Sequence, residues 1–191
     1  MPSLHAAEIA PDIVIRARAG DGKARERIYH ELSGPVYTLI RRLVVRPAVA
    51  EELLHDVFVE ILRSLPSYSA TGSFIGWVRS IAVSKALMYL RSPWHRSLSW
   101  LGADGDLPAT EVAGPVAESR DLEQALWSLP AVSRAVVWLH DVEGFTHAEI
   151  ARHFGRTISF SKSQLSRAHI ELRDRLKPQG ESACMPVSRS S

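Results

Sequence analysis

The chain has 191 residues, of which 46% are hydrophobic and 23% are charged, with a net charge of +2. This length fits one domain or two small ones, and the composition is ordinary for a folded soluble protein. A single cysteine excludes an internal disulfide and a cysteine metal cluster, and without a membrane-spanning apolar run or a secretory leader the protein is expected to be cytoplasmic.

The first predicted domain covers residues 12–91 and contains helices only. Residues 1–11 are expected to form a flexible leader. Helices are predicted from Asp12 to the Gly20-Asp21-Gly22 break, over 24–32, over 36–45, and from Pro47 onward.

Residues 50–65 have the clearest helical periodicity in the chain. Apolar residues recur at three- and four-residue steps, which predicts a buried face. They are Ala50, Leu53, Leu54, Val57, Phe58, Ile61, Leu62 and Leu65. The opposite face is largely acidic but contains Val59. It is either a plain solvated face or a surface for a partner protein.

A loop, a helix and a linker follow in order. Residues 66–73 have the composition of a loop, and a helix is predicted over 74–90. Residues 92–120 are rich in Pro, Gly, Ala and acids, so they are expected to form a flexible linker, although its apolar Trp94 and Trp100 could dock on a domain or a partner.

The second predicted domain covers residues 121–177 and is again helical, followed by a disordered tail over 178–191. One helix ends before Pro130, and another runs over 132–139 and ends before Gly144. The whole fold is therefore predicted as all-α, with two small helical domains joined by a linker.

Residues 146–168 have the layout of a helix-turn-helix, whose second helix normally enters a DNA groove. Thr146 and Glu149 have the spacing of a capping box, and Gly155 suits a sharp helix stop. The second helix is expected to begin near Thr157 or Ser159. An ordinary helical hairpin with a solvated polar face would fit the same pattern.

Charge is divided unevenly along the chain. Residues 152–177 hold seven basic and two acidic residues, and residues 12–91 hold 12 basic and 8 acidic residues. Residues 92–120 instead hold two basic and four acidic residues. Two basic blocks around an acidic connector favour two modules that face nucleic acid.

Both blocks resemble the sigma-70 type factors of bacterial RNA polymerase, in the extracytoplasmic-function group. In the first block, AEELLHDVFVEI (50–61) and FIGWVRSIA (74–82) resemble the family's A-E-D-L-x-Q-x-V-F and F-x-x-W-L-x-x-I-A segments. In the second block, residues 122–155 and KSQLSRA (162–168) resemble its L-x-x-A-L-x-x-L-P helix, its G-x-S-x-x-E-I-A helix and its K-S-R-L-x-R-A segment.

The chain also departs from the family pattern at several positions. His55 replaces a usual glutamine, and Ser84 and Met88 replace a usual asparagine and aspartate, so capture of a promoter base could be altered. Residues 159–161 replace Gly-Thr-Val. Phe160 either packs inward or faces DNA, where it could touch a thymine methyl group.

The resemblance implies a transcription initiation factor and not an enzyme, with core RNA polymerase, promoter DNA and an anti-sigma factor as partners. No cofactor, metal or small-molecule substrate is expected. The helix over 50–63 would dock on the β′ clamp of the polymerase. Its predicted polymerase-binding residues are Glu51, Glu52, His55, Asp56, Val59, Glu60 and Arg63.

The resemblance also assigns two DNA surfaces. Residues 66–73 and the helix after them would capture and hold the opened −10 strand, with Tyr68 as the stacking ring. The predicted −10 residues are Tyr68, Ser69, Thr71, Ser73, Arg79, Ser84, Lys85 and Arg91. The second helix of the helix-turn-helix would read the −35 element through Arg156, Phe160, Lys162, Gln164, Ser166, Arg167 and Arg173.

Three other functions are considered. A sigma-like decoy or adaptor would bind polymerase or an anti-sigma factor without initiating transcription. A plain helix-turn-helix regulator would have no use for the acidic helix over 50–63. A metal enzyme is suggested by scattered histidines around 140–153, but the HExxH pattern is absent and Glu149 already serves as a helix cap.

Overall fold

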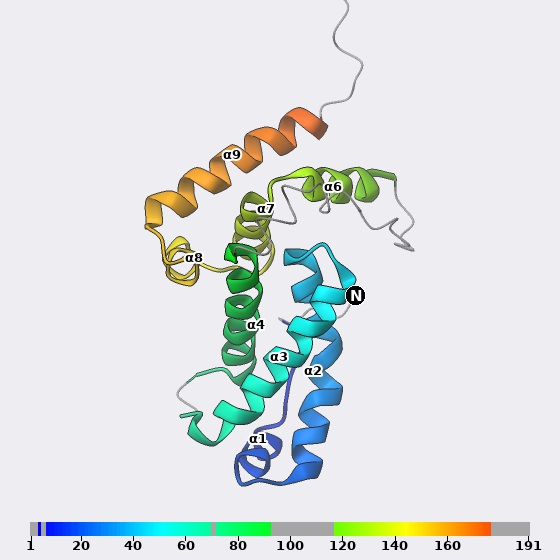
Figure 1. Ribbon diagram of the computed structural model, residues 1–191, viewed down its shortest axis with the longest axis vertical. Coiled ribbons are helices and arrows are strands. Elements are labelled where there is room, and N and C mark those ends of the chain that lie inside the picture. Colours follow the sequence, from blue (N-terminus) through cyan, green and yellow to red (C-terminus); the bar gives the residue numbers. More distant parts are fainter. Residues whose placement is uncertain (1–3, 5–6, 70–71, 93–116, 177–191) are drawn as a thin grey trace, which may run out of the picture.

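The computed structural model describes residue 4 and residues 7–69, 72–92 and 117–176, and it is all-α over these residues. The helices gather in two bundles, the N-terminal bundle (α1 to α4) below and the C-terminal bundle (α6 to α9) above (Figure 1). No helix in the described parts of the chain is long and apolar enough to cross a membrane.

The N-terminal bundle packs four helices around one core. They are α1 (Pro11–Arg18), α2 (Gly22–Leu43), α3 (Pro47–Ser64) and α4 (Phe74–Arg91), with a 3₁₀ turn, η2 (Leu65–Ser67), after α3. Proline at the first position of α1 and of α3 needs no helical N–H there, which favours these starts. Leu4, inside the predicted flexible leader, is buried in this core. The prediction that all of 1–11 is loose was therefore wrong at this residue.

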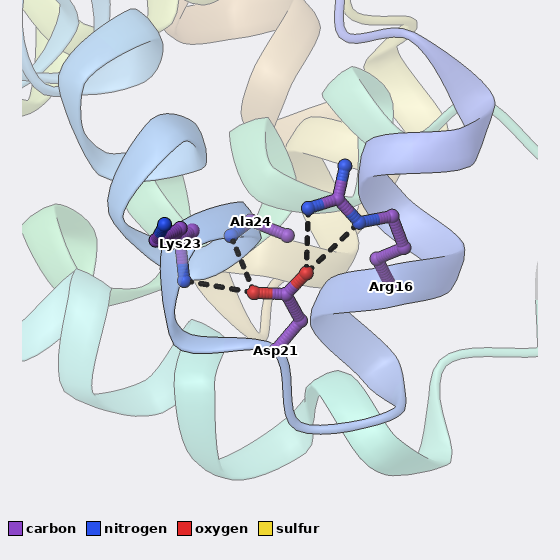
Figure 2. Close-up of polar contacts among 4 residues, drawn as sticks. All are labelled: Arg16, Asp21, Lys23 and Ala24. Carbon is purple, nitrogen blue, oxygen red and sulfur yellow. Dashed lines mark hydrogen bonds and ion pairs between the residues drawn. The ribbon is translucent and has the colours of Figure 1, made fainter.

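Asp21 joins α1 to α2 (Figure 2). Its Oδ1 accepts hydrogen bonds from the backbone N–H groups of Lys23 at 2.9 Å and Ala24 at 3.3 Å, which caps α2. Its Oδ2 accepts from Arg16 Nε at 2.8 Å. The hydrogen bond from Arg16, aided by those from the α2 backbone, holds the pKa of Asp21 below its ordinary value.

Helix α2 is continuous, which corrects the two helices predicted over 24–32 and 36–45. A proline inside a helix costs about 3 kcal/mol because it lacks the N–H and crowds the preceding turn. Pro35 is itself buried, and Leu32, Val36 and Leu39 continue one buried stripe past it. Burial of each such side chain contributes about 1.5–3 kcal/mol, which is enough to keep the helix whole.

The C-terminal bundle consists of α6 (Ala117–Ser128), α7 (Ala131–Val137) with a π-helical turn η4 (Trp138–Val142), α8 (His147–Phe154) and α9 (Ile158–Leu176). The buried Arg134 fixes the link between α6 and α7. Its Nη1 donates to the carbonyls of Trp127 at 3.3 Å and Leu129 at 3.1 Å. The start of α6 lies inside the linker predicted over 92–120, and residues 93–116 lie outside the described residues.

The predicted helix-turn-helix is confirmed in its local geometry. Thr146 Oγ1 accepts from Glu149 N–H at 3.3 Å, and Glu149 Oε2 accepts from Thr146 N–H at 2.8 Å, which forms the capping box. Gly155 ends α8 with φ of 60°, a left-handed conformation that favours glycine. Phe160 N–H donates to Thr157 Oγ1 at 3.2 Å at the start of α9.

The capping box gives a stability prediction. Thr146→Ala should lower the free energy of unfolding by about 1 kcal/mol at neutral pH, because the Glu149 N–H loses its acceptor and Glu149 Oε2 loses the hydroxyl donor. The hydrogen bond from the backbone of Thr146 lowers the pKa of Glu149, so this stabilisation exists above the ordinary pKa and is lost as pH falls through the lowered one.

Chemical denaturation at neutral pH and at acidic pH measures this effect. Thr38→Ala is the control, since Thr38 Oγ1 donates to the Gly34 carbonyl inside α2 and caps no helix end there. Equal losses in the two variants at neutral pH would contradict the prediction.

Candidate partner and nucleic-acid interfaces

Helix α3 presents its predicted acidic face to solvent. Glu52, Asp56 and Val59 follow one another at helical spacing, and Val59 is 51% exposed. The exposed residues of this face, which we call the α3 ridge, are Glu51, Glu52, His55, Asp56, Val59 and Arg63. A charged surface around an apolar contact suits a protein partner.

Glu60 differs from the rest of the predicted polymerase-binding set. It is only half-exposed, and its Oε1 accepts from Ser64 Oγ at 2.8 Å. Its Oε2 lies 3.9 Å from Lys85 Nζ of α4. Glu60 therefore connects α3 to α4, and Lys85 is paired within the bundle.

The structure corrects the expectation that Tyr68 offers a free stacking ring. Tyr68 is only 8% exposed, and its hydroxyl donates to the Gly72 carbonyl at 2.7 Å. Its ring centroid lies 5.5 Å from that of Phe74 and 4.9 Å from that of Trp77. The three rings form an aromatic cluster that supports the loop, so Tyr68 cannot stack on a base in this conformation.

The remaining loop residues have different environments. Ser69 is exposed, and Thr71 lies outside the described residues. Ser73 is exposed, but its Oγ accepts from the Gly76 N–H at 3.2 Å and so caps α4.

Three of the predicted −10 residues on α4 reach across to the C-terminal bundle. Arg79 Nη1 donates to the Glu143 carbonyl at 2.9 Å, and its guanidinium lies 4.4 Å from the centre of the Phe145 ring. Ser84 Oγ lies 3.1 Å from His153 Nδ1. Arg91 Nη1 donates to the Phe154 carbonyl at 3.1 Å. Burial lowers the pKa of His153, so its ring is neutral at this contact at neutral pH.

Helix α9 presents several of the predicted −35 residues to solvent. Lys162, Ser166 and Arg167 are exposed on it, and Arg156 and Arg173 are exposed at its two ends. Gln164 is half-buried, and its Oε1 accepts from Ser133 Oγ at 3.0 Å. The amide nitrogen is the group of Gln164 that remains for a base or phosphate contact.

The structure corrects the inclusion of Phe160 in the predicted −35 set. Its ring is partly buried, packs against the core and lies 5.7 Å from the Phe154 ring. The sequence left open whether Phe160 packs inward or faces DNA. In the structure it packs inward, because Phe154 of α8 provides an apolar neighbour.

A histidine-aspartate cluster ties the turn before α8 to α9. Asp141 Oδ2 lies 2.6 Å from His169 Nε2, and Asp141 Oδ1 lies 2.8 Å from His140 Nδ1. Burial would raise the pKa of Asp141, but the hydrogen bonds from these two histidines outweigh it and lower that pKa. The cluster orients α9, and sequence reasoning did not assign it this role.

Sequence reasoning also missed a contact between α2 and α6. Arg42 forms an ion pair with Glu123, and its guanidinium lies 5.1 Å from the centre of the Trp138 ring. The partners are 81 positions apart in sequence. No local pattern could have paired them.

Family models match both bundles. Residues 28–96 match the model described as sigma-70 region 2, and residues 119–171 match that of sigma-70 region 4. The two matches occur in the order of the two bundles and include the α3 ridge, helix α4 and the helix-turn-helix.

Curated relatives extend this similarity across most of the chain. The chain is 34% identical over 147 residues to the ECF RNA polymerase sigma factor SigE of Mycolicibacterium smegmatis, covering 74% of this chain and 57% of SigE. It is 30% identical over 152 residues to SigK of Mycolicibacterium vanbaalenii, an ECF RNA polymerase sigma factor, covering 76% of this chain and 78% of SigK. It thus spans little more than half of SigE but over three quarters of SigK.

Two solved structures share the fold. The sigma factor RpoE of Bartonella quintana, in complex with the anti-sigma factor NepR, aligns with a TM-score of 0.57 and 21% identity over 81% of this chain and 97% of that chain. CnrH in complex with the cytosolic domain of CnrY aligns with a TM-score of 0.52 and 16% identity over 85% and 94%. At these identities the likeness concerns the fold alone.

Proposed function

The chain belongs to the extracytoplasmic-function group of the sigma-70 family, and on this premise we propose that it is a transcription initiation factor that brings core RNA polymerase to promoter DNA. The observation that carries the proposal is the order of its surfaces. An exposed acidic ridge, a basic α4 and a helix-turn-helix follow one another along the chain, within the matches to regions 2 and 4. The chain acts by binding, and no catalytic step is proposed.

The α3 ridge binds the β′ clamp of the polymerase. Glu51, Glu52 and Asp56 offer carboxylates to basic side chains of the partner, and Val59 adds an apolar contact between them. Such exposed charge pairs orient the encounter and raise its rate more than they add affinity. His55 and Arg63 complete this surface, whereas the paired Glu60 serves mainly to position α4.

Helix α4 and the loop before it hold the opened −10 strand. Unstacking DNA costs a few kcal/mol per base step, which the factor must offset by binding the separated strand. Arg79 and Arg91 hold phosphates, and Ser69 and Ser73 border the site where a base is captured. Ser84 lies between the two arginines on α4. Lys85 contributes positive charge from beside them.

Helix α9 binds the −35 element in the major groove. Lys162, Ser166 and Arg167 face the base edges, Gln164 offers its amide nitrogen from the side bonded to Ser133, and Arg156 and Arg173 contact phosphates on either side. The inward Phe160 supports the start of α9 and is not part of this contact.

Arg167→Ala tests the −35 surface. Binding to a −35 duplex should weaken by about 1–3 kcal/mol if the guanidinium reads a guanine. If it holds a phosphate, the slope of log affinity against log salt should become shallower by about 0.9. Fluorescence anisotropy over a range of salt concentrations measures both quantities. Arg18→Ala, an exposed arginine of α1, is the matched control. Equal affinity and slope in the two variants would remove Arg167 from the surface.

We also propose regulation by an anti-sigma factor. RpoE and CnrH were each solved with such a regulator or a cytosolic partner domain, which is a property of those proteins. An exposed ridge on α3 would suit competition between that regulator and polymerase. Run-off transcription with core polymerase tests the proposed function and separates an initiation factor from a decoy, which would bind the enzyme and yield no transcript.

A further inference from the structure

An exposed apolar side chain stands in the first turn of α9, the helix proposed to read the −35 element. Ile158 is the first residue of α9, and its exposed fraction is 49%. Thr157 fixes this turn, because its Oγ1 accepts from the Phe160 N–H at 3.2 Å. The direction of the Ile158 side chain is therefore set by a capped helix start.

The inward packing of Phe160 turns Ile158 outward. Successive residues of an α-helix are about 100° apart around its axis, so side chains two positions apart point in nearly opposite directions. Phe160 packs against the core beside Phe154, and Ile158 accordingly points away from Phe160 and is exposed. Lys162 lies one turn further along α9 on the same side as Ile158 and is also exposed.

Ile158 lies between basic side chains. Arg156 precedes it and is exposed, with its guanidinium 6.0 Å from the centre of the Phe160 ring. Lys162 follows it on the same side of α9. Basic groups on both sides hold phosphates and so bring the apolar side chain between them to the base edges, which the N-terminal residues of a recognition helix contact.

Ile170 is a second exposed apolar residue of α9, but its position is different. It lies about 18 Å further along the helix axis than Ile158, which exceeds the width of the major groove, about 12 Å. Ile158 is therefore the better placed of the two for a base at the point where α9 enters the groove.

We propose that Ile158 reads a thymine of the −35 element by packing against its C5-methyl group. This methyl is the apolar group that base pairs present in the major groove. The inference rests on the proposed function, since it names a base that α9 recognises. Ile158 takes the thymine contact that the sequence left open for Phe160, whose ring is packed against Phe154 instead.

Selection from a pool of randomised duplexes identifies the thymine. The full chain and its Ile158→Ala variant should enrich a common element, but the preference for thymine at one position should fall about fourfold in Ile158→Ala, as expected for one buried methyl group. Ile158→Val keeps the branch at Cβ and should retain most of that preference. Ile15→Ala, which truncates an exposed isoleucine of α1, is the matched control and should enrich the same element as the unmodified chain.

Exchange of that thymine for uracil provides the second measurement. Uracil lacks the methyl group and keeps the hydrogen-bonding groups of the base pair. The affinity of the unmodified chain for the enriched duplex should fall about fourfold on this exchange, as measured by fluorescence anisotropy. In Ile158→Ala the same exchange should change the affinity less than about 1.5-fold, because the side chain that contacts the methyl is already truncated. Circular dichroism checks that each variant retains its helices.

Two results would overturn the thymine contact: an equal loss on uracil exchange in Ile158→Ala and in the unmodified chain, or no loss in the unmodified chain at any thymine of the element. Failure of the proposed function looks different, because run-off transcription with core polymerase then gives no transcript, whatever the duplex measurements show. An unmodified chain that enriches no element would contradict both the thymine contact and the proposed −35 surface.

Discussion

Glu52→Lys/Asp56→Lys should weaken binding to core RNA polymerase about 100-fold, equivalent to about 2.8 kcal/mol. The two carboxylates lie one helical turn apart on the exposed face of α3, beside Val59. Reversing the charge of Glu52 and Asp56 replaces attraction to a basic partner surface by repulsion at two adjacent side chains. The association rate should fall more than the dissociation rate rises, because exposed charges act mainly on the encounter.

Surface plasmon resonance with immobilised core enzyme measures this effect at several salt concentrations. The control is Glu26→Lys/Glu31→Lys, which makes the same change in net charge on exposed positions of α2. Equal losses in the two double variants would show that only the overall charge matters. That result would contradict a docking surface on α3.

Arg79→Gln/Arg91→Gln should lower run-off transcription about tenfold or more, while affinity for core polymerase stays within twofold. Both guanidinium groups donate to backbone carbonyls of the other bundle, and they can exchange these acceptors for phosphates. Without them the opened strand loses two charge-assisted contacts. A tenfold effect corresponds to about 1.4 kcal/mol.

The matched control is Arg18→Gln/Lys23→Gln, which removes two exposed positive charges from α1 and α2. Binding to a −35 duplex should be the same in both variants, because α9 is unchanged. If transcription in the α4 variant equals that of the control, α4 does not hold the strand.

Local sequence patterns correctly predicted the elements that are determined by residues close together in the sequence. The buried face of α3 followed from apolar spacing, except that Leu62 is 40% exposed. The capping box of α8 followed from Thr146 and Glu149. The start of α9 near Thr157 was predicted from the same kind of signal.

The failures came where tertiary packing outweighs local preference. Two helices were predicted over 24–32 and 36–45, but the buried stripe on both sides of Pro35 keeps α2 continuous. The family resemblance assigned Tyr68 as a stacking ring, whereas its ring packs on Phe74 and Trp77. The sequence left Phe160 undecided, because its environment depends on Phe154 of another helix.

The contacts between the bundles could not be predicted at all. Arg91 meets Phe154 and Arg79 meets Glu143 across more than sixty positions of sequence. Each of these residues has a plausible local role as an exposed charge or a core side chain. Only the packing of α4 on α8 reveals that the arginines proposed to hold the promoter strand contact the C-terminal bundle.

Reconstitution of the purified chain with core polymerase, followed by mapping of transcript start sites, tests the central claim most directly. The account predicts a stable complex and transcripts that start at fixed distances downstream of two recurring sequence elements. Failure to associate with core polymerase, or transcripts that start at random positions as with core enzyme alone, would contradict it.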